Sequence, residues 1–221
     1  MRFYLFFIVM FSFVSSFAQL PKGFVYVKDV IPDLDVELRY FSTHNFVGIP
    51  IEGYVLHKLI LTTQTAEALK RVQEELQMQN LCLKVYDGYR PQRAVNHFRD
   101  WARDIGDTLN KQAFYPEIKK QYLFAEGYIA TRSGHSKGST VDLTLIDGNM
   151  GNPLDMGSDF DFFGKASWVN YQSITDKQKE NRQILQRIML KHGFRNYSKE
   201  WWHFTLRHEP FPNTYFDFPV E

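Results

Sequence analysis

The chain has 221 residues, and its 26 lysines and arginines nearly balance its 25 aspartates and glutamates. This balance argues against nucleic acid or an anionic membrane as a partner. With 44% hydrophobic and 23% charged residues, the composition is that of a globular protein, which excludes disordered, collagen-like and coiled-coil chains. The single cysteine, Cys82, allows neither an internal disulfide nor a zinc site of paired thiolates, so a metal must be held by histidine and carboxylate.

Residues 1–18 have the layout of a secretory signal peptide. Arg2 precedes an apolar run over 3–11, and the small residues Ser16 and Ala18 suit cleavage after Ala18. A retained membrane anchor is the alternative, but a span needs about 20 apolar residues, and Ser12, Ser15 and Ser16 follow this short run. We therefore predict an exported protein whose mature chain over 19–221 has no stable membrane span.

No repeat or low-complexity linker divides the sequence after residue 18, so we predict one domain over 19–221, in which strands and helices are mixed. Alternating apolar and polar residues over 24–40 predict strands and extended segments. Apolar residues at spacings of three and four predict a helix over 65–79, and Asn80 is expected to end it.

A strand over 81–86 is expected next, because the residues there are rich in apolar and branched side chains. The following turn, Asp87-Gly88-Tyr89-Arg90-Pro91, is expected to place Pro91 at the first position of another helix. The predicted buried face of that helix runs from Ala94 to Ile105.

In the second half, a strand is predicted over 141–145, with Asp142 pointing away from the face that carries Val141 and Leu143. Capping-box spacing at Thr175 opens a predicted helix that ends at Gly193, and a last core strand is expected over 204–206. Strands and helices that do not alternate regularly favour an α+β fold, in which helices pack on an antiparallel or mixed sheet.

Three short stretches carry the residues that predict chemistry. The first, Ser133-Gly134-His135-Ser136-Lys137-Gly138-Ser139-Thr140-Val141-Asp142, places a histidine and an aspartate on a loop that contains glycine. The second, Glu200-Trp201-Trp202-His203, places a carboxylate before another histidine. Two histidines and one aspartate leave a fourth position for water, which is typical of catalytic zinc, and Glu200 would then be free to act on that water. The third stretch places Arg90 at the end of a strand.

Each stretch also has a structural interpretation. A histidine and an aspartate at this spacing occur together by chance in many proteins. The tryptophans of 200–203 suit a strand that fills the core. Arg90 can simply form an ion pair with Asp87. Spacing alone therefore leaves the zinc hydrolase as one of several open interpretations.

The same stretches, in this order, resemble the D-alanyl-D-alanine dipeptidases, zinc peptidases of the vancomycin-resistance type. The family signature S-x-H-x-x-G-x-A-x-D, followed by E-x-x-H, is met by Ser133, His135, Gly138, Asp142, Glu200 and His203. Tyr89-Arg90-Pro91 matches a further family motif. Thr140 replaces the signature alanine, and its extra bulk is expected to alter the shape of the pocket.

The resemblance implies one zinc ion held by His135, Asp142 and His203, with Glu200 as the base that acts on water. It implies that Arg90 stabilises the oxyanion of the transition state. For the two ends of a D-Ala-D-Ala dipeptide, it suggests Asp161 for the ammonium group and Ser133 for the carboxylate.

The resemblance implies a bacterial protein, so the predicted export means a periplasmic or extracellular location. Export argues against a role in destroying cytoplasmic cell-wall precursor and favours scavenging of D-Ala-D-Ala released during wall turnover. Two alternatives stay open. A D,D-carboxypeptidase or endopeptidase acting on peptidoglycan would use the same zinc ligands in an open groove. A non-catalytic zinc-bearing binding module of the same fold would need neither Glu200 nor Arg90.

Overall fold

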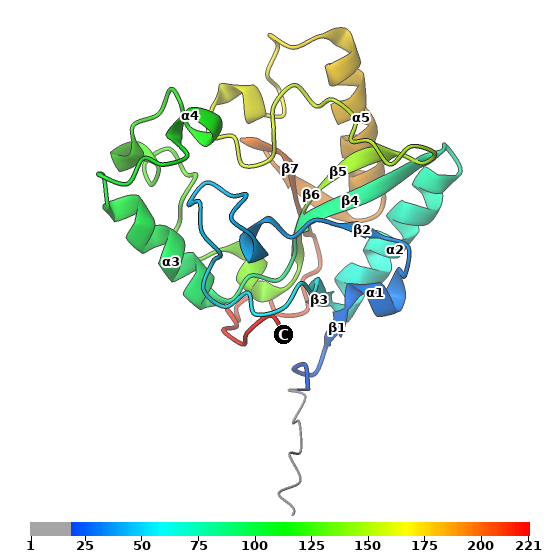
Figure 1. Cartoon of the computed structure of the whole chain (residues 1–221). Helices are drawn as coiled ribbons and strands as arrows, with labels where there is room; N and C mark the ends of the chain where they lie inside the picture. Colours follow the sequence, from blue (N-terminus) through cyan, green and yellow to red (C-terminus); the bar gives the residue numbers. More distant parts are fainter. Residues whose placement is uncertain (1–18) are drawn as a thin grey trace, which may run out of the picture.

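The computed structural model in Figure 1 describes residues 19–221, so the predicted signal peptide, residues 1–18, lies outside the described residues. Strands and helices are mixed without a regular alternation, which confirms the predicted α+β fold. Within 19–221, no helix combines the length and the apolar character that crossing a membrane requires.

A mixed five-stranded sheet lies at the centre of the molecule, with its strands in the order β2-β4-β5-β7-β6. Among these neighbours, β2 and β4 run parallel and the other pairs run antiparallel. A smaller antiparallel sheet pairs β1 with β3. The bounds of the strands are β1 Phe24–Tyr26, β2 Asp35–Val36, β3 Ile60–Thr62, β4 Leu81–Asp87, β5 Thr140–Asp147, β6 Phe194–Tyr197 and β7 Glu200–Leu206.

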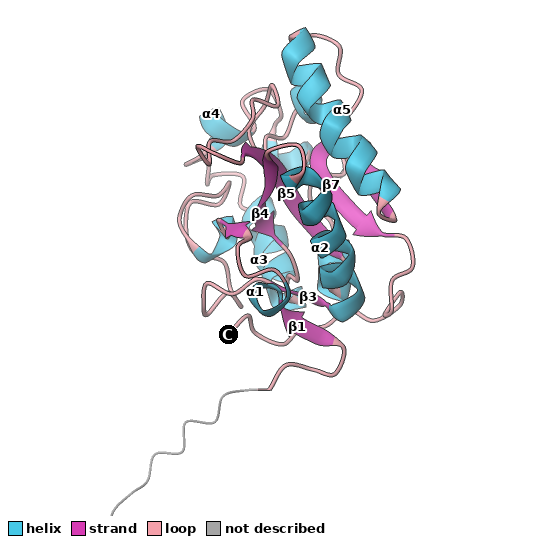
Figure 2. Ribbon diagram, turned by 90° about the vertical axis from the view of Figure 1, so that its right-hand side faces the viewer, coloured by secondary structure: helices cyan, strands magenta, loops and turns pink. Residues whose placement is uncertain are grey.

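The longer helices cover the central sheet. Figure 2 shows α2 and α5 on one side of it, and in Figure 1 α3 lies at the opposite side of the molecule from α2. The capping box predicted at Thr175 is present at the start of α5, and Gly193, with a φ of 91°, follows its end. The bounds of the helices are α1 Val27–Val30, α2 Thr63–Gln77, α3 Gln92–Arg103, α4 Lys111–Phe114 and α5 Asp176–Lys191.

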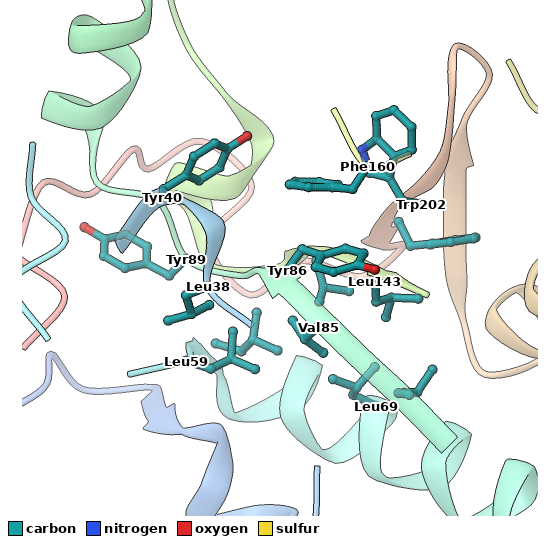
Figure 3. Close-up of a cluster of buried hydrophobic side chains, with 14 of the residues drawn as sticks. Leu38, Tyr40, Leu59, Leu69, Val85, Tyr86, Tyr89, Leu143, Phe160 and Trp202 are labelled. Carbon is teal, nitrogen blue, oxygen red and sulfur yellow. The ribbon is translucent and has the colours of Figure 1, made fainter. Parts of the chain in front are cut away.

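Both faces of β5 are buried, and they carry different chemistry. On one face, Leu143 lies opposite Val85 of β4, and Figure 3 shows both residues next to Leu69 of α2. Asp142 points to the other face, because side chains alternate along a strand. β5 is therefore a core strand on its helix-covered face and a ligand-bearing strand on the other.

A β-bulge in β4 sets the register near Asp142. Val85 pairs with Leu143, but the next paired residues are Asp87 and Asp142, so the register shifts between Val85 and Asp87. An extra residue in one strand changes the direction of the side chains that follow it. The bulge thus places Asp87, rather than Tyr86, directly opposite Asp142.

Several local predictions were wrong. Residues 27–30 form the helical turn α1 inside the segment predicted to be extended, and Val27 of this turn is buried. Pro91 precedes α3 in an extended conformation (ψ 150°) instead of occupying its first turn. Ile105 lies beyond the end of α3 and is 66% exposed, because the chain has turned away from the core there. Strand β6 was not predicted.

Candidate active site

Neighbouring strands bring two acidic side chains and a histidine to one end of the central sheet. Asp142 on β5 has His203 of β7 as its Cα partner on one side and Asp87 of β4 on the other. Residues directly opposite each other in adjacent strands point to the same face of a sheet. The three side chains therefore meet on the face that β5 turns away from α2.

His135 reaches the same point from a short 3-10 turn, Gly134–Lys137, that precedes β5. The hydroxyl of Ser133 caps this turn by accepting a hydrogen bond from the backbone N–H of His135 at 3.2 Å. The turn ends at Gly138, where φ is 76° and an added side chain would collide with Phe24. Nδ1 of His135 lies 2.8 Å from the carbonyl oxygen of Gly88, which assigns the ring proton to Nδ1 and leaves Nε2 as a metal donor.

The ligand atoms of His135, Asp142 and His203 all lie within 4.8 Å of one another. Nε2 of His135 is 3.2 Å from Oδ2 of Asp142, and Nδ1 of His203 is 3.0 Å from Oδ1. Oδ1 is nevertheless buried without an accepted hydrogen bond. Burial acts to raise the pKa of Asp142, but the two histidines outweigh it and hold this pKa below its usual range. A carboxylate that is ionised, lies between two imidazoles and has one oxygen without a hydrogen bond is suited to bind a zinc ion.

Glu200, at the start of β7, lies beside these residues. Its Oε2 is 3.4 Å from Nδ1 of His203. Burial raises the pKa of Glu200 to about 7, while His203 acts to lower it and Asp142 to raise it further. The set of two histidines and one aspartate is complete without Glu200, so its carboxylate is free to exchange a proton with a molecule in the site.

Arg90 is fixed by the buried carboxylate of Asp87. Its Nε and Nη2 lie 2.9 and 2.8 Å from Oδ2 of Asp87, and Nη2 is 3.5 Å from Oδ2 of Asp142. The hydroxyl of Tyr54 donates to the other oxygen of Asp87 at 2.6 Å. The ion pair of the structural interpretation is therefore present, and it holds the guanidinium against the predicted metal ligands.

Asp161 lies at another wall of the site, where it is only 5% exposed and has a positive φ of 61°. The hydroxyl of Tyr40 donates a hydrogen bond to its Oδ2 at 2.8 Å. Burial, and next the charge of Asp142, raise the pKa of Asp161 well above its usual range. A buried carboxylate of this kind is stabilised as an anion when a cation binds beside it.

All seven residues predicted for the site line one cavity of about 310 Å³. This volume is at the lower end of the range for small-molecule sites, about 300–1,000 Å³. Aromatic side chains supply much of the remaining wall, among them Phe46, Phe98 and Tyr128. The cavity therefore suits a small ligand with charged groups.

A family model described as D-ala-D-ala dipeptidase matches residues 21–221. The chain belongs to this family. A D-alanyl-D-alanine dipeptidase of Enterococcus faecium is 40% identical over 199 residues, which are 90% of this chain and 98% of the relative. One of Streptomyces coelicolor is 39% identical over 201 residues, covering 91% of this chain and all of the relative. Membership in the dipeptidase family confirms the predicted family and the predicted enzyme class, a zinc metallopeptidase.

Among solved structures, a vancomycin-resistance D,D-pentapeptidase in complex with Zn(II) is similar over 70% of this chain and 77% of its own. The TM-score is 0.42 and the identity 14%. This likeness is too weak to carry an argument about the dipeptidase site.

The structure places Thr140 and adds residues that sequence reasoning missed. Thr140 does not itself line the cavity; its hydroxyl lies 2.9 Å from that of Thr205 on β7, and it packs behind Gly134, which does line the cavity. Tyr40, Tyr54 and Arg132 were missed. Tyr54 forms a hydrogen bond with Asp87, and Arg132 directly precedes Ser133, so both are neighbours of motif residues. No sequence pattern connects Tyr40 with Asp161, since 121 positions separate them.

Proposed function

We propose that the protein hydrolyses free D-Ala-D-Ala to two D-alanines, with zinc held by His135, Asp142 and His203. The observation that carries this proposal is the convergence of this ligand set with Glu200, Arg90 and Asp161 in one small cavity. Zinc, when bound, supplies a Lewis acid that polarises the peptide carbonyl and lowers the pKa of water to roughly 7.

Glu200 is the proton carrier of the reaction. Its carboxylate accepts a proton from the attacking water as the oxygen–carbon bond forms. It then delivers that proton to the nitrogen of the leaving D-alanine as the peptide bond breaks. The raised pKa of Glu200, about 7, suits a group that must both take up and release a proton near neutral pH.

Arg90 stabilises the negative oxygen that develops on the carbonyl carbon. Nε and Nη2 are committed to Asp87, so the guanidinium cannot turn freely toward solvent. Fixed donors that meet charge only in the transition state lower the barrier without strengthening ground-state binding. Asp87 therefore acts on the reaction by positioning Arg90.

Asp161 favours a free dipeptide over a wall-linked stem peptide. The ammonium group of D-Ala-D-Ala would pair with the Asp161 carboxylate, whereas the corresponding nitrogen of a stem peptide is acylated and neutral. Comparing hydrolysis of D-Ala-D-Ala with that of N-acetyl-D-Ala-D-Ala tests this specificity. We expect preference for the free dipeptide, and Asp161→Asn should reduce that preference by roughly tenfold to a hundredfold. Equal rates on both substrates would favour the D,D-carboxypeptidase alternative.

The proposed setting is outside the cytoplasm, in the recycling of cell-wall fragments. It rests on the signal-peptide layout of residues 1–18. Protein isolated from its native host should begin at Gln19 and be found in the exported fraction. Mass spectrometry that finds an intact Met1 on the protein in a cytoplasmic fraction would contradict export while leaving the enzymatic proposal untouched.

A further inference from the structure

A dipeptide presents a charge at each end, and the cavity holds a cation that the proposed reaction does not use. The charged lining of the cavity, apart from its histidines, consists of Arg90, Arg132, Asp142, Asp161 and Glu200. Asp142 faces the metal, Glu200 the water and Asp161 the ammonium group. The two arginines are therefore the charged groups that remain as partners for the carboxylate of the substrate.

Arg90 is poorly suited to that carboxylate. Two of its nitrogens are engaged by Asp87, and the guanidinium lies over the ring of Tyr40 at 4.8 Å. In the proposed mechanism, the remaining N–H donors of Arg90 bind the oxyanion of the transition state. A substrate carboxylate on Arg90 would compete with that role.

Arg132 is free to take the carboxylate. Among residues 19–221 its guanidinium has no hydrogen bond or ion pair with a protein group, and it lies 5.0 Å from the centre of the Tyr215 ring. Stacking on an aromatic ring restrains a guanidinium while leaving its N–H edge available. The neighbouring backbone N–H of Phe216 donates to the carbonyl oxygen of Ser136, which ties the segment that carries Tyr215 to the turn of His135.

Ser133 provides a second donor beside Arg132. Its oxygen accepts a hydrogen bond from the N–H of His135, so its own O–H proton remains available. Both residues directly precede the turn that carries His135. A carboxylate bound by them would therefore be positioned by the same segment that positions a metal ligand.

We propose that Arg132 binds the C-terminal carboxylate of the substrate, next to the Ser133 hydroxyl that the resemblance suggests for that group, and that Arg132 is the residue that favours a charged carboxyl end over a neutral one. The proposal rests on the dipeptidase function. Arginine presents paired N–H donors that match the two oxygens of a carboxylate. Arg132 is a specificity residue, whereas the bond-breaking groups are elsewhere in the cavity.

The test compares D-Ala-D-Ala with D-Ala-D-alaninamide, in which the terminal charge is absent. Wild-type protein should prefer the acid over the amide in kcat/KM. Arg132→Met keeps the apolar stem and removes the charge, and it should lower that preference about tenfold, mainly by raising KM for the acid. Arg132→Lys should retain part of the preference, because lysine keeps the positive charge but lacks the paired N–H donors of a guanidinium. Arg103→Met, a change at an exposed arginine paired with Asp100, is the matched control and should leave the preference unchanged.

The two proposals fail in different ways. If wild-type protein hydrolyses D-Ala-D-Ala but Arg132→Met leaves the acid-to-amide preference unchanged, the carboxylate assignment is wrong and the function stands. If wild-type protein hydrolyses neither substrate with zinc present, the function and the assignment fall together.

Discussion

The proposed metal side of the cavity, with His135, Asp142 and His203, and its proposed recognition side, with Asp161 and Arg132, are built differently. Asp142 and His203 lie on hydrogen-bonded neighbouring strands, and a capped turn holds His135 against them. Asp161 and Arg132, by contrast, lie on connecting segments between strands and helices. Ligand geometry must be held within a few tenths of an ångström, which strands and packed turns provide. Connecting segments tolerate sequence change more easily, so they are the part of the site where substrate choice can vary.

The largest effect is expected from breaking the metal side. His135→Ala or His203→Ala removes one of three protein ligands, so bound zinc and activity should be lost together. The measurement is zinc content by atomic absorption alongside D-alanine release. His208→Ala, at an exposed histidine, is the matched control and should keep both. A His135→Ala protein with one zinc at wild-type affinity would overturn the ligand assignment.

Glu200 separates catalysis from metal binding on the same strand. Glu200→Gln keeps the shape of the side chain but cannot accept the proton of water, so kcat should fall by about 10²–10⁴. Zinc content should remain at the wild-type level, because the ligand set excludes Glu200. If zinc were lost and added metal restored turnover, Glu200 would instead orient a ligand.

Arg90 lies between the two sides, and its loss should affect both rate and stability. Arg90→Ala should lower kcat roughly a hundredfold, the scale for a lost oxyanion donor, with a smaller change in KM. The melting temperature should also fall, because Asp87 would be left buried without its cation. Arg90→Lys should recover only part of kcat, since lysine lacks the rigid, paired N–H donors of a guanidinium. Full activity in Arg90→Ala would remove Arg90 from the mechanism.

The smallest effect concerns packing behind the metal side. A Cβ added at Gly134 would lie 2.8 Å from Oγ1 of Thr140. Gly134→Ala should therefore destabilise the protein by about 1–3 kcal/mol, as overpacking does. Adding Thr140→Ala should relieve part of that cost, which chemical denaturation of the single and double variants would show. Additive losses would mean that the two positions do not interact.

Local sequence patterns predicted the parts of the fold that local physics determines. Periodicity located α2 and α5, the capping box marked the start of α5, and alternation along β5 correctly turned Asp142 away from Leu143. The short helix α1 and the end of α3 were missed because tertiary packing decides them. The paired placement of Asp142 and His203 also depends on strand register, which no short motif specifies.

The candidate site was predicted unevenly for the same reason. His135, Asp142, Glu200 and His203 lie in dense motifs with recognisable chemistry, and the structure brings all four together. The Tyr54–Asp87–Arg90 network depends on the β-bulge in β4, and the pairing of Tyr40 with Asp161 depends on the whole fold. The proposed recognition residues, which lie on connecting segments, are the hardest to predict from a single sequence.

The central claim is that this cavity hydrolyses D-Ala-D-Ala with zinc. The most direct measurement is D-alanine release from the dipeptide by purified protein over residues 19–221, before chelation, after chelation and after zinc is returned. We expect turnover in the untreated protein, its loss after the chelator, and its recovery at one zinc per chain. Turnover that persists in protein shown to be free of metal, or no turnover at any zinc concentration, would contradict the claim.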